Sequence, residues 1–203
     1  TSVEDIQRLL DVYNQYESQI TSEKFTSLKD ELIPSQDDGN WYLDQKNFHN
    51  INFNTMKNGG MNNSGISTAH WRHEKQKYIK IFLKRYKNDH KNFLSELSLL
   101  KDTCYFSVIS LYGQYSDDKY HYLVFEYGGK PLVSQCPLKF KKDNERMKYI
   151  ANIGFQIASA MMYLEKKNIV HRDLTASNVL VDHHGFVRVA DFGHAIQKLS
   201  EDN

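Results

Sequence analysis

The sequence is poor in several residue types that would mark particular classes of protein. Its 203 residues include two cysteines, Cys104 and Cys136, and three prolines. Two cysteines are too few for a disulfide framework, so we expect a reducing compartment, the cytoplasm or the nucleus. The net charge of +1 provides no field that would attract nucleic acid or an anionic membrane. No apolar run reaches the length of a membrane span, and the first residues lack the apolar core of a signal peptide.

Residues 1–40 differ in pattern from the rest of the chain. Apolar side chains recur at helical spacing over residues 1–16 and 21–33, and Pro34 ends the second run. Residues 34–40 have the composition of a linker. We therefore predict an N-terminal helical extension. One interpretation is a regulatory or partner-binding helical hairpin, and the other is an extension that packs on the main domain or remains from a neighbouring domain.

From Trp41 onward, short strands and two longer helices replace this pattern. Helices are expected over residues 87–102 and 147–167, where apolar positions keep the helical period. Strands are expected over residues 50–57, 77–84, 106–115 and 120–128, and a strand–turn–strand unit over 178–193. The order predicts an α+β fold in which a sheet with one helix precedes a mostly helical part.

Residues with carboxylate and amide side chains gather near the end of the sequence. The sequence "HRDLTASN" carries Asp173 and Asn178, and "DFG" follows at Asp191. Phosphoryl transfer requires a held nucleotide, neutralised phosphate charge and an acceptor hydroxyl oriented by a carboxylate. Carboxylate and amide oxygens are also the ligands that a hard cation such as Mg²⁺ prefers. These residues therefore predict a phosphotransferase.

In these motifs and their order, the chain from about Trp41 to its end resembles the eukaryotic protein kinases. The loop "HRDLTASN" is most similar to tyrosine-kinase-like enzymes, although Thr175 stands where serine/threonine kinases carry Lys. The resemblance implies a bilobal fold with a β-rich N-lobe over residues 41–127. It implies a C-lobe with the catalytic loop over residues 128–203.

The resemblance also assigns roles to single residues. Asp173 would orient the acceptor hydroxyl as the catalytic carboxylate, while Asn178 and Asp191 would bind Mg²⁺. Lys80, in "YIKIFLK", would contact the phosphates of ATP and form an ion pair with Glu96 in "NFLSELSLL".

The nucleotide would lie between a glycine-rich loop and the hinge of the two lobes. The hinge is expected at "LVFEYGG", where backbone groups of Glu126 and Gly128 would bind the adenine, and Leu180 would also line the site. The loop is expected at "GMNNSGIS", with Gly60 and Gly65 in the glycine positions.

Three residues depart from the family pattern around the adenine. Asn62 replaces the middle glycine of the loop, and Ser67 replaces the valine that follows it. Tyr78 stands two residues before Lys80, where the family usually carries Ala, so its ring would occupy the space of the base. These departures favour a second interpretation, a pseudokinase with an occluded pocket that acts as a binding or scaffold module.

The first interpretation is a protein kinase that transfers the γ-phosphate of Mg-ATP to protein hydroxyls in signalling. Ten residues follow Gly193, and they do not include an Ala-Pro-Glu motif. The activation segment and the helices that cover the back of the C-lobe in the family are also missing. We therefore expect the sequence to be a piece of a longer protein with a truncated C-lobe that is inactive by itself.

Overall fold

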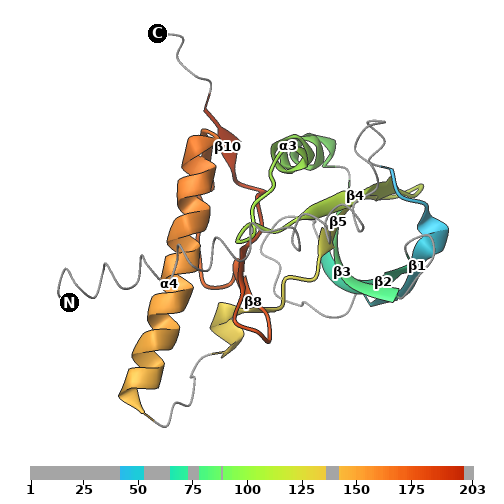
Figure 1. Ribbon diagram of the computed structural model, residues 1–203. Helices are drawn as coiled ribbons and strands as arrows, with labels where there is room; N and C mark the ends of the chain where they lie inside the picture. The colour runs from blue at the N-terminus through green and yellow to red at the C-terminus, as the bar shows by residue number, and fades with distance from the viewer. Residues whose placement is uncertain (1–41, 53–64, 73–77, 88, 136–141, 199–203) are drawn as a thin grey trace. The chain divides into compact units, whose positions relative to one another are not determined.

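The computed structural model describes residues 42–52, 65–72, 78–87, 89–135 and 142–198 (Figure 1). The chain divides into two units, Thr1–Trp41 and Tyr42–Asn203. The first unit contains the expected helical extension and lies outside the described residues. Gly60 and Asn62 of the expected glycine-rich loop also lie outside them. Every described element belongs to the second unit.

A five-stranded antiparallel sheet forms the first part of this unit, where the sequence predicted a sheet but not its strand β2. A short 3₁₀ turn (Gln45–Asn47) leads into it. The strands are β1 (Phe48–Asn52), β2 (Gly65–Arg72), β3 (Tyr78–Tyr86), β4 (Leu111–Ser116) and β5 (His121–Glu126). They stand in the order β1-β2-β3-β5-β4. The register of β1 shifts between His49 and Asn52, and Asn50 between them has a positive φ of 52°, which asparagine tolerates better than most residues.

Strand β2 begins inside the segment that was expected to be the phosphate-binding loop. Ser67 lies opposite Leu83 of β3, whereas Ile66 lies opposite Lys84 and Thr68 opposite Phe82. Cross-strand partners share one face of a sheet. Ser67 is fully buried on the face of Leu83. The prediction that Ser67 helps to roof the adenine is therefore wrong, because its side chain projects from the face opposite that of Lys84.

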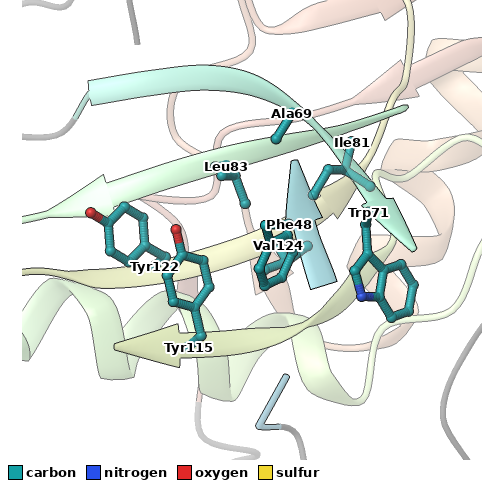
Figure 2. Packing of buried hydrophobic residues seen from close by; sticks show 8 residues of the cluster. All are labelled: Phe48, Ala69, Trp71, Ile81, Leu83, Tyr115, Tyr122 and Val124. Atoms are coloured by element: carbon teal, nitrogen blue, oxygen red, sulfur yellow. The ribbon is translucent and has the colours of Figure 1, made fainter. Parts of the chain in front are cut away.

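The core of the sheet lies on the face to which Ile81 and Leu83 of β3 project (Figure 2). The buried residues of this cluster are Phe48, Ala69, Trp71, Ile81, Leu83, Tyr115, Tyr122 and Val124. Figure 2 shows the rings of Tyr115 and Tyr122 face to face, with their centroids 4.2 Å apart. Aromatic and β-branched side chains on alternate positions thus fix which face of each strand is buried.

Helix α3 (His90–Lys101) follows β3 and packs against β5 (Figure 1). Asp89 caps its N-terminus by accepting a hydrogen bond from the backbone N–H of Asn92. The helix buries Phe93, Glu96, Leu99 and Leu100. Glu96 is the charged residue of this buried stripe, which already indicates that it has a partner in the sheet.

The second part of the unit is built around helix α4 (Asp143–Lys166). The helix starts with acidic residues in its first turn and has Lys166 in its last, the arrangement that the helix dipole favours. Asn168 follows it with a positive φ of 55° and ends it. Short elements precede and follow the helix in the chain: β6 (Lys130–Pro131), a 3₁₀ turn (Leu132–Gln135), β7 (Ile169–Val170), β8 (Val179–Val181), β9 (Val187–Val189) and β10 (Ile196–Gln197).

Strand β9 connects this part to the sheet side of the unit. It pairs with β8 in the three-stranded sheet β6-β8-β9. Its Val189 also accepts a hydrogen bond from the N–H of Ile109 at 2.9 Å and donates one to the carbonyl of Ser107 at 2.8 Å. Residues 107–109 lie between α3 and β4. The backbone just before Asp191 is therefore bonded to the segment that follows α3.

Truncation of Leu83 tests the core of the sheet. Leu83 is fully buried, so we predict that Leu83→Ala lowers the free energy of unfolding by about 2–5 kcal/mol through lost contacts and a cavity. Met162 on α4 is exposed, and Met162→Ala should change it by no more than about 0.5 kcal/mol. Urea titrations followed by circular dichroism measure both. Equal losses in the two variants would contradict this description of the core.

Candidate active site

The centre of the site is an ammonium group held between two carboxylates. Nζ of Lys84 lies 2.6 Å from Oε2 of Glu96 and 2.7 Å from Oδ1 of Asp191. Lys84 comes from β3, Glu96 from α3, and Asp191 from the segment after β9. One side chain thus joins three elements that are far apart in the sequence.

The lysine that pairs with Glu96 is Lys84, so the prediction that Lys80 forms this pair is wrong. Nζ of Lys80 lies 3.9 Å from the ring centroid of Tyr127, and Lys80 is exposed. Lys80 and Lys84 are four residues apart on one strand and therefore share a face, so strand periodicity cannot distinguish them. Their positions along the strand decide which lysine pairs with Glu96, because Lys84 reaches Glu96 on α3 whereas Lys80 lies over the ring of Tyr127.

Burial and the two carboxylates act in opposite directions on Lys84. Burial alone lowers the pKa of Lys84, but the charges of Glu96 and Asp191 outweigh it and hold this pKa above its ordinary value. Burial alone likewise raises the pKa of Asp191, but Lys84 and the N–H of Gly193 lower it overall. Lys84 is therefore charged and Asp191 ionised near neutral pH.

The tyrosine two residues after Lys84 adds a second donor to Glu96. The hydroxyl of Tyr86 donates to Oε2 of Glu96 at 2.5 Å, the same oxygen that Lys84 contacts. Tyr86 is 2% exposed, and burial, followed by the charge of Glu96, raises its pKa far above the ordinary value. The phenol is therefore neutral and can only act as a donor toward the carboxylate.

The catalytic loop holds Asp173 and Asn178 together. The amide nitrogen of Asn178 donates to the carbonyl of Asp173 at 3.0 Å and to its carboxylate oxygen Oδ2 at 2.9 Å. The N–H of Ala190 donates to the carbonyl of Asn178 at 2.8 Å, which brings this loop beside Asp191. The structure thus brings together Asp173, Asn178 and Asp191, the three residues singled out from "HRDLTASN" and "DFG".

One hydrogen bond and one longer contact lie between this loop and the segment after Asp191. Arg172 has a positive φ of 63°, and its Nε donates to the carbonyl of His194 at 2.5 Å. Nδ1 of His194 lies 3.8 Å from Oδ2 of Asp173. The segment after Asp191 is therefore held against the catalytic loop, and His194 is a neighbour of Asp173 that the motif did not indicate.

The predicted hinge connects the two parts of the unit through Glu126. Oε1 of Glu126 accepts a hydrogen bond from the N–H of Ser110 at 2.8 Å, and Oε2 accepts one from Nε of Arg188 at 3.3 Å. Arg188 belongs to β9, three residues before Asp191. Sequence reasoning missed Arg188, because nothing in the local pattern of β9 indicates a partner in the hinge.

Two glycines let the hinge run close to β8. A Cβ atom on Gly128 would lie 3.0 Å from side-chain atoms of both Ile109 and Leu180. Gly129 has φ +105°, and a Cβ there would lie 2.3 Å from the carbonyl oxygen of Val181. Gly128 and Leu180, both predicted to line the site, therefore lie against each other.

The residue two positions before Lys84 is Phe82, not Tyr78. Tyr78 is 55% exposed, and its ring meets His49 edge to face. Phe82 is 8% exposed, and its ring centroid lies 4.8 Å from that of Tyr127 in the hinge. Because the paired lysine is Lys84, the bulky residue in the position where the family usually carries Ala is Phe82 and not Tyr78.

Of the two glycines expected in the glycine-rich loop, the structure describes Gly65, which starts β2 beside the side chain of Arg85.

The signal for Lys84 was present in the sequence. Lys84 ends the run Ile81-Phe82-Leu83, and all four residues are buried. A lysine inside a run that is buried on both faces of a sheet requires an anionic partner, whereas Lys80 precedes this run.

The fold, the contacts of Lys84 with Glu96 and Asp191, and the loop of Asp173 and Asn178 beside them match the arrangement of a protein kinase. The family model of "Protein tyrosine and serine/threonine kinase" matches residues 52–203. The chain therefore belongs to the protein tyrosine and serine/threonine kinase family, as the motifs predicted.

Individual relatives of the chain are named as kinases, and one of them as a tyrosine kinase. The chain is 32% identical over 103 residues to Aurora kinase of Schizosaccharomyces pombe and 35% identical over 102 residues to the cAMP-dependent protein kinase catalytic subunit of Dictyostelium discoideum. It is 33% identical over 108 residues to the human tyrosine-protein kinase Fer. These alignments cover 50–52% of this chain but 28%, 15% and 13% of the respective relatives.

None of the described helices is long and apolar enough to cross a membrane.

The protonation of His171 gives the stability of the site a testable pH dependence. Its Nδ1 faces the N–H of Asp173 and its Nε2 the carbonyl of Ala190, which fits the neutral ring. Burial lowers the pKa of His171 below its ordinary value, although the Ala190 carbonyl and nearby carboxylates oppose this. The unfolded chain therefore binds this proton more readily, so the stability contributed by neutral His171 is present above about pH 6.5 and decreases below it.

We predict that the free energy of unfolding decreases between pH 7 and pH 5 and that this decrease is smaller in His171→Phe. The phenyl ring keeps the contact with Phe192, whose centroid lies 4.8 Å from that of His171, but it cannot be protonated. Urea titrations at several pH values give the two slopes. Identical slopes for the wild type and the variant would contradict the proposed state of His171.

Proposed function

We propose that the chain carries the nucleotide-binding and catalytic groups of a protein kinase that transfers the γ-phosphate of ATP to hydroxyl groups of a signalling protein. The observation that carries the proposal is the position of Lys84, within 2.7 Å of both Glu96 and Asp191. In phosphoryl transfer by kinases, a lysine held in this way contacts the phosphates, and the aspartate binds the metal ion that bridges them.

The donor atoms of the site fit Mg²⁺. Among the described residues, Oδ2 of Asp191 and Oδ1 of Asn178 have no hydrogen-bond partner, so each can bind a cation. The described residues contain no group of three or more His, Cys, Asp or Glu that would form an all-protein metal site. Two protein oxygens together with phosphate oxygens match the usual coordination of Mg²⁺ by kinases, and bound Mg²⁺ would neutralise phosphate charge.

Asp173 would orient the acceptor hydroxyl and accept its proton. Asn178 fixes the carboxylate of Asp173 through Oδ2, and Oδ1 of Asp173 remains for the hydroxyl. Glu126 and Gly128 would bind the adenine edge through their backbone. The N–H of Glu126 is occupied by the carbonyl of Ser110, so its carbonyl is the backbone group that remains for the base.

Substitution of Lys84 and Lys80 tests which lysine acts on ATP. In the protein that carries this chain, Lys84→Met should reduce kcat/KM for ATP by about 100-fold or more, because it removes a fixed charge from the phosphates. Lys80→Met should change it by at most about fivefold, since an exposed cation–π contact contributes about 0.5–1 kcal/mol. Transfer of labelled γ-phosphate to a peptide library containing Ser, Thr and Tyr measures both.

The stability of the variants must be measured in parallel, because Lys84→Met leaves Glu96 buried without its charge partner. Lys84→Arg keeps the charge and serves as the control for folding. A larger loss of activity in Lys80→Met than in Lys84→Met would reject the assignment of Lys84.

A specific observation favours the pseudokinase as the second candidate. Phe82 projects from the face of β3 that carries Lys84, and its ring lies on Tyr127 in the hinge. A phenyl ring at this position, where the family usually carries Ala, would occupy the space of the adenine. In this case the chain would act as a binding or scaffold module with an occluded pocket.

Thermal unfolding with Mg-ATP distinguishes the two candidates. An occluded pocket predicts no stabilisation of the wild type and a clear stabilisation of Phe82→Ala, by about 2.7 kcal/mol at 100 times the dissociation constant. Each variant is compared with itself without nucleotide, because the substitution also removes core contacts. Tyr78→Ala is the matched control and should behave like the wild type. Stabilisation of the wild type by Mg-ATP would reject occlusion and support the kinase.

A further inference from the structure

Tyr86 lies outside the motifs that identify the family, yet it contacts the centre of the site. Its hydroxyl donates to Oε2 of Glu96 at 2.5 Å, and Lys84 contacts the same oxygen at 2.6 Å. Lys84 and Tyr86 are two residues apart on β3, so both project from the same face toward α3. Strand β3 thus holds one carboxylate of α3 with two donors.

Packing fixes the ring of Tyr86 in this position. Tyr86 is 2% exposed, and its ring meets that of Phe93 edge to face with centroids 5.6 Å apart. Phe93 precedes Glu96 by three residues on α3 and is also buried. The hydroxyl therefore cannot turn away from Glu96 without moving the ring out of the core between β3 and α3.

The two donors to Glu96, Lys84 and Tyr86, differ in their other contacts. Lys84 is shared, because its ammonium group also contacts Asp191 at 2.7 Å and under the proposed function must reach the phosphates. Tyr86 has Glu96 as its acceptor in the structure. A buried carboxylate is strongly destabilised when its cationic partner moves away, unless another hydrogen-bond donor remains.

We propose that Tyr86 is a positioning residue that keeps Glu96 satisfied while Lys84 turns to the phosphates of the nucleotide. The neutral phenol adds a donor without adding a second positive charge that would compete with Lys84. This inference rests on the proposed function, because it concerns how the lysine is released to the nucleotide. It assigns to this chain a three-membered cluster of Lys84, Tyr86 and Glu96.

Tyr86→Phe tests the role because it removes the hydroxyl and keeps the ring on Phe93. Without the hydroxyl, Lys84 can contact the phosphates only at the expense of Glu96, so we expect KM for ATP to rise about tenfold. Once ATP is bound, Asp173 and the acceptor are unaffected, so kcat should stay within about twofold of the wild type. Steady-state kinetics in the protein that carries this chain give both values.

A matched control exists in the same sheet. Tyr122 is also buried, and its hydroxyl also donates to a carboxylate, that of Asp117 at 2.8 Å, but it belongs to the core cluster on the other face. Tyr122→Phe should leave KM and kcat unchanged. An equal rise of KM in both variants would show a general loss of stability and would overturn the proposal.

The Glu96→Gln background tests whether Tyr86 acts through Glu96. A neutral amide needs no second donor, so adding Tyr86→Phe to Glu96→Gln should change KM by no more than about twofold. A full tenfold effect in this background would overturn the proposal, and so would an unchanged KM in Tyr86→Phe alone.

Hydrogen exchange of the α3 amides supplies a measurement without nucleotide. Exchange should be faster in Tyr86→Phe than in Tyr122→Phe, because the first variant weakens the bond between α3 and β3. Equal exchange in the two variants would overturn the role of Tyr86 even if the protein does not use ATP. Failure of the wild type to bind ATP would instead overturn the proposed kinase function.

Discussion

The site depends on one buried positive charge that two carboxylates share. Burial disfavours the charge of Lys84, but the charges of Glu96 and Asp191 outweigh this effect and hold the pKa of Lys84 above its ordinary value. The same contacts determine where α3 lies on the sheet and where the segment after β9 lies below it. One cluster of charges therefore joins β3, α3 and the segment after β9, in addition to the apolar packing of α3.

Most of the fold could be predicted from the sequence because the periodicity of its elements is strong. Helices α3 and α4 were expected over residues 87–102 and 147–167 and were found at His90–Lys101 and Asp143–Lys166. Strand β2 was missed because its first residues were interpreted as the end of a glycine-rich loop. Strands β7 and β10 were missed because two residues carry no recognisable pattern, and their pairing depends on tertiary contacts.

The candidate site was predicted well where its residues are close in sequence and less well where they are distant. Asp173, Asn178 and Asp191 lie within one segment, and the resemblance of that segment to the kinase motifs singled them out. The partner of Glu96 comes from another element, and strand periodicity alone places two lysines on one face of β3. The structure distinguishes them by position along the strand. With Lys84 as the partner of Glu96, the bulky residue in the position of the family's Ala is Phe82, which is buried, and not Tyr78, which is exposed.

Strand β9 gives the molecule a mechanical property that its sequence does not suggest. Its residue Val189 is bonded to the backbone of Ser107 and Ile109, and Arg188 beside it is bonded to Glu126 in the hinge. On its other side β9 pairs with β8, and the N–H of its Val187 donates to Oε1 of Gln156 on α4 at 2.9 Å. The strand that leads to Asp191 is thus bonded both to the sheet part and to the helical part of the unit. Any rotation of one part against the other would therefore have to break hydrogen bonds of β9 on one of its two sides.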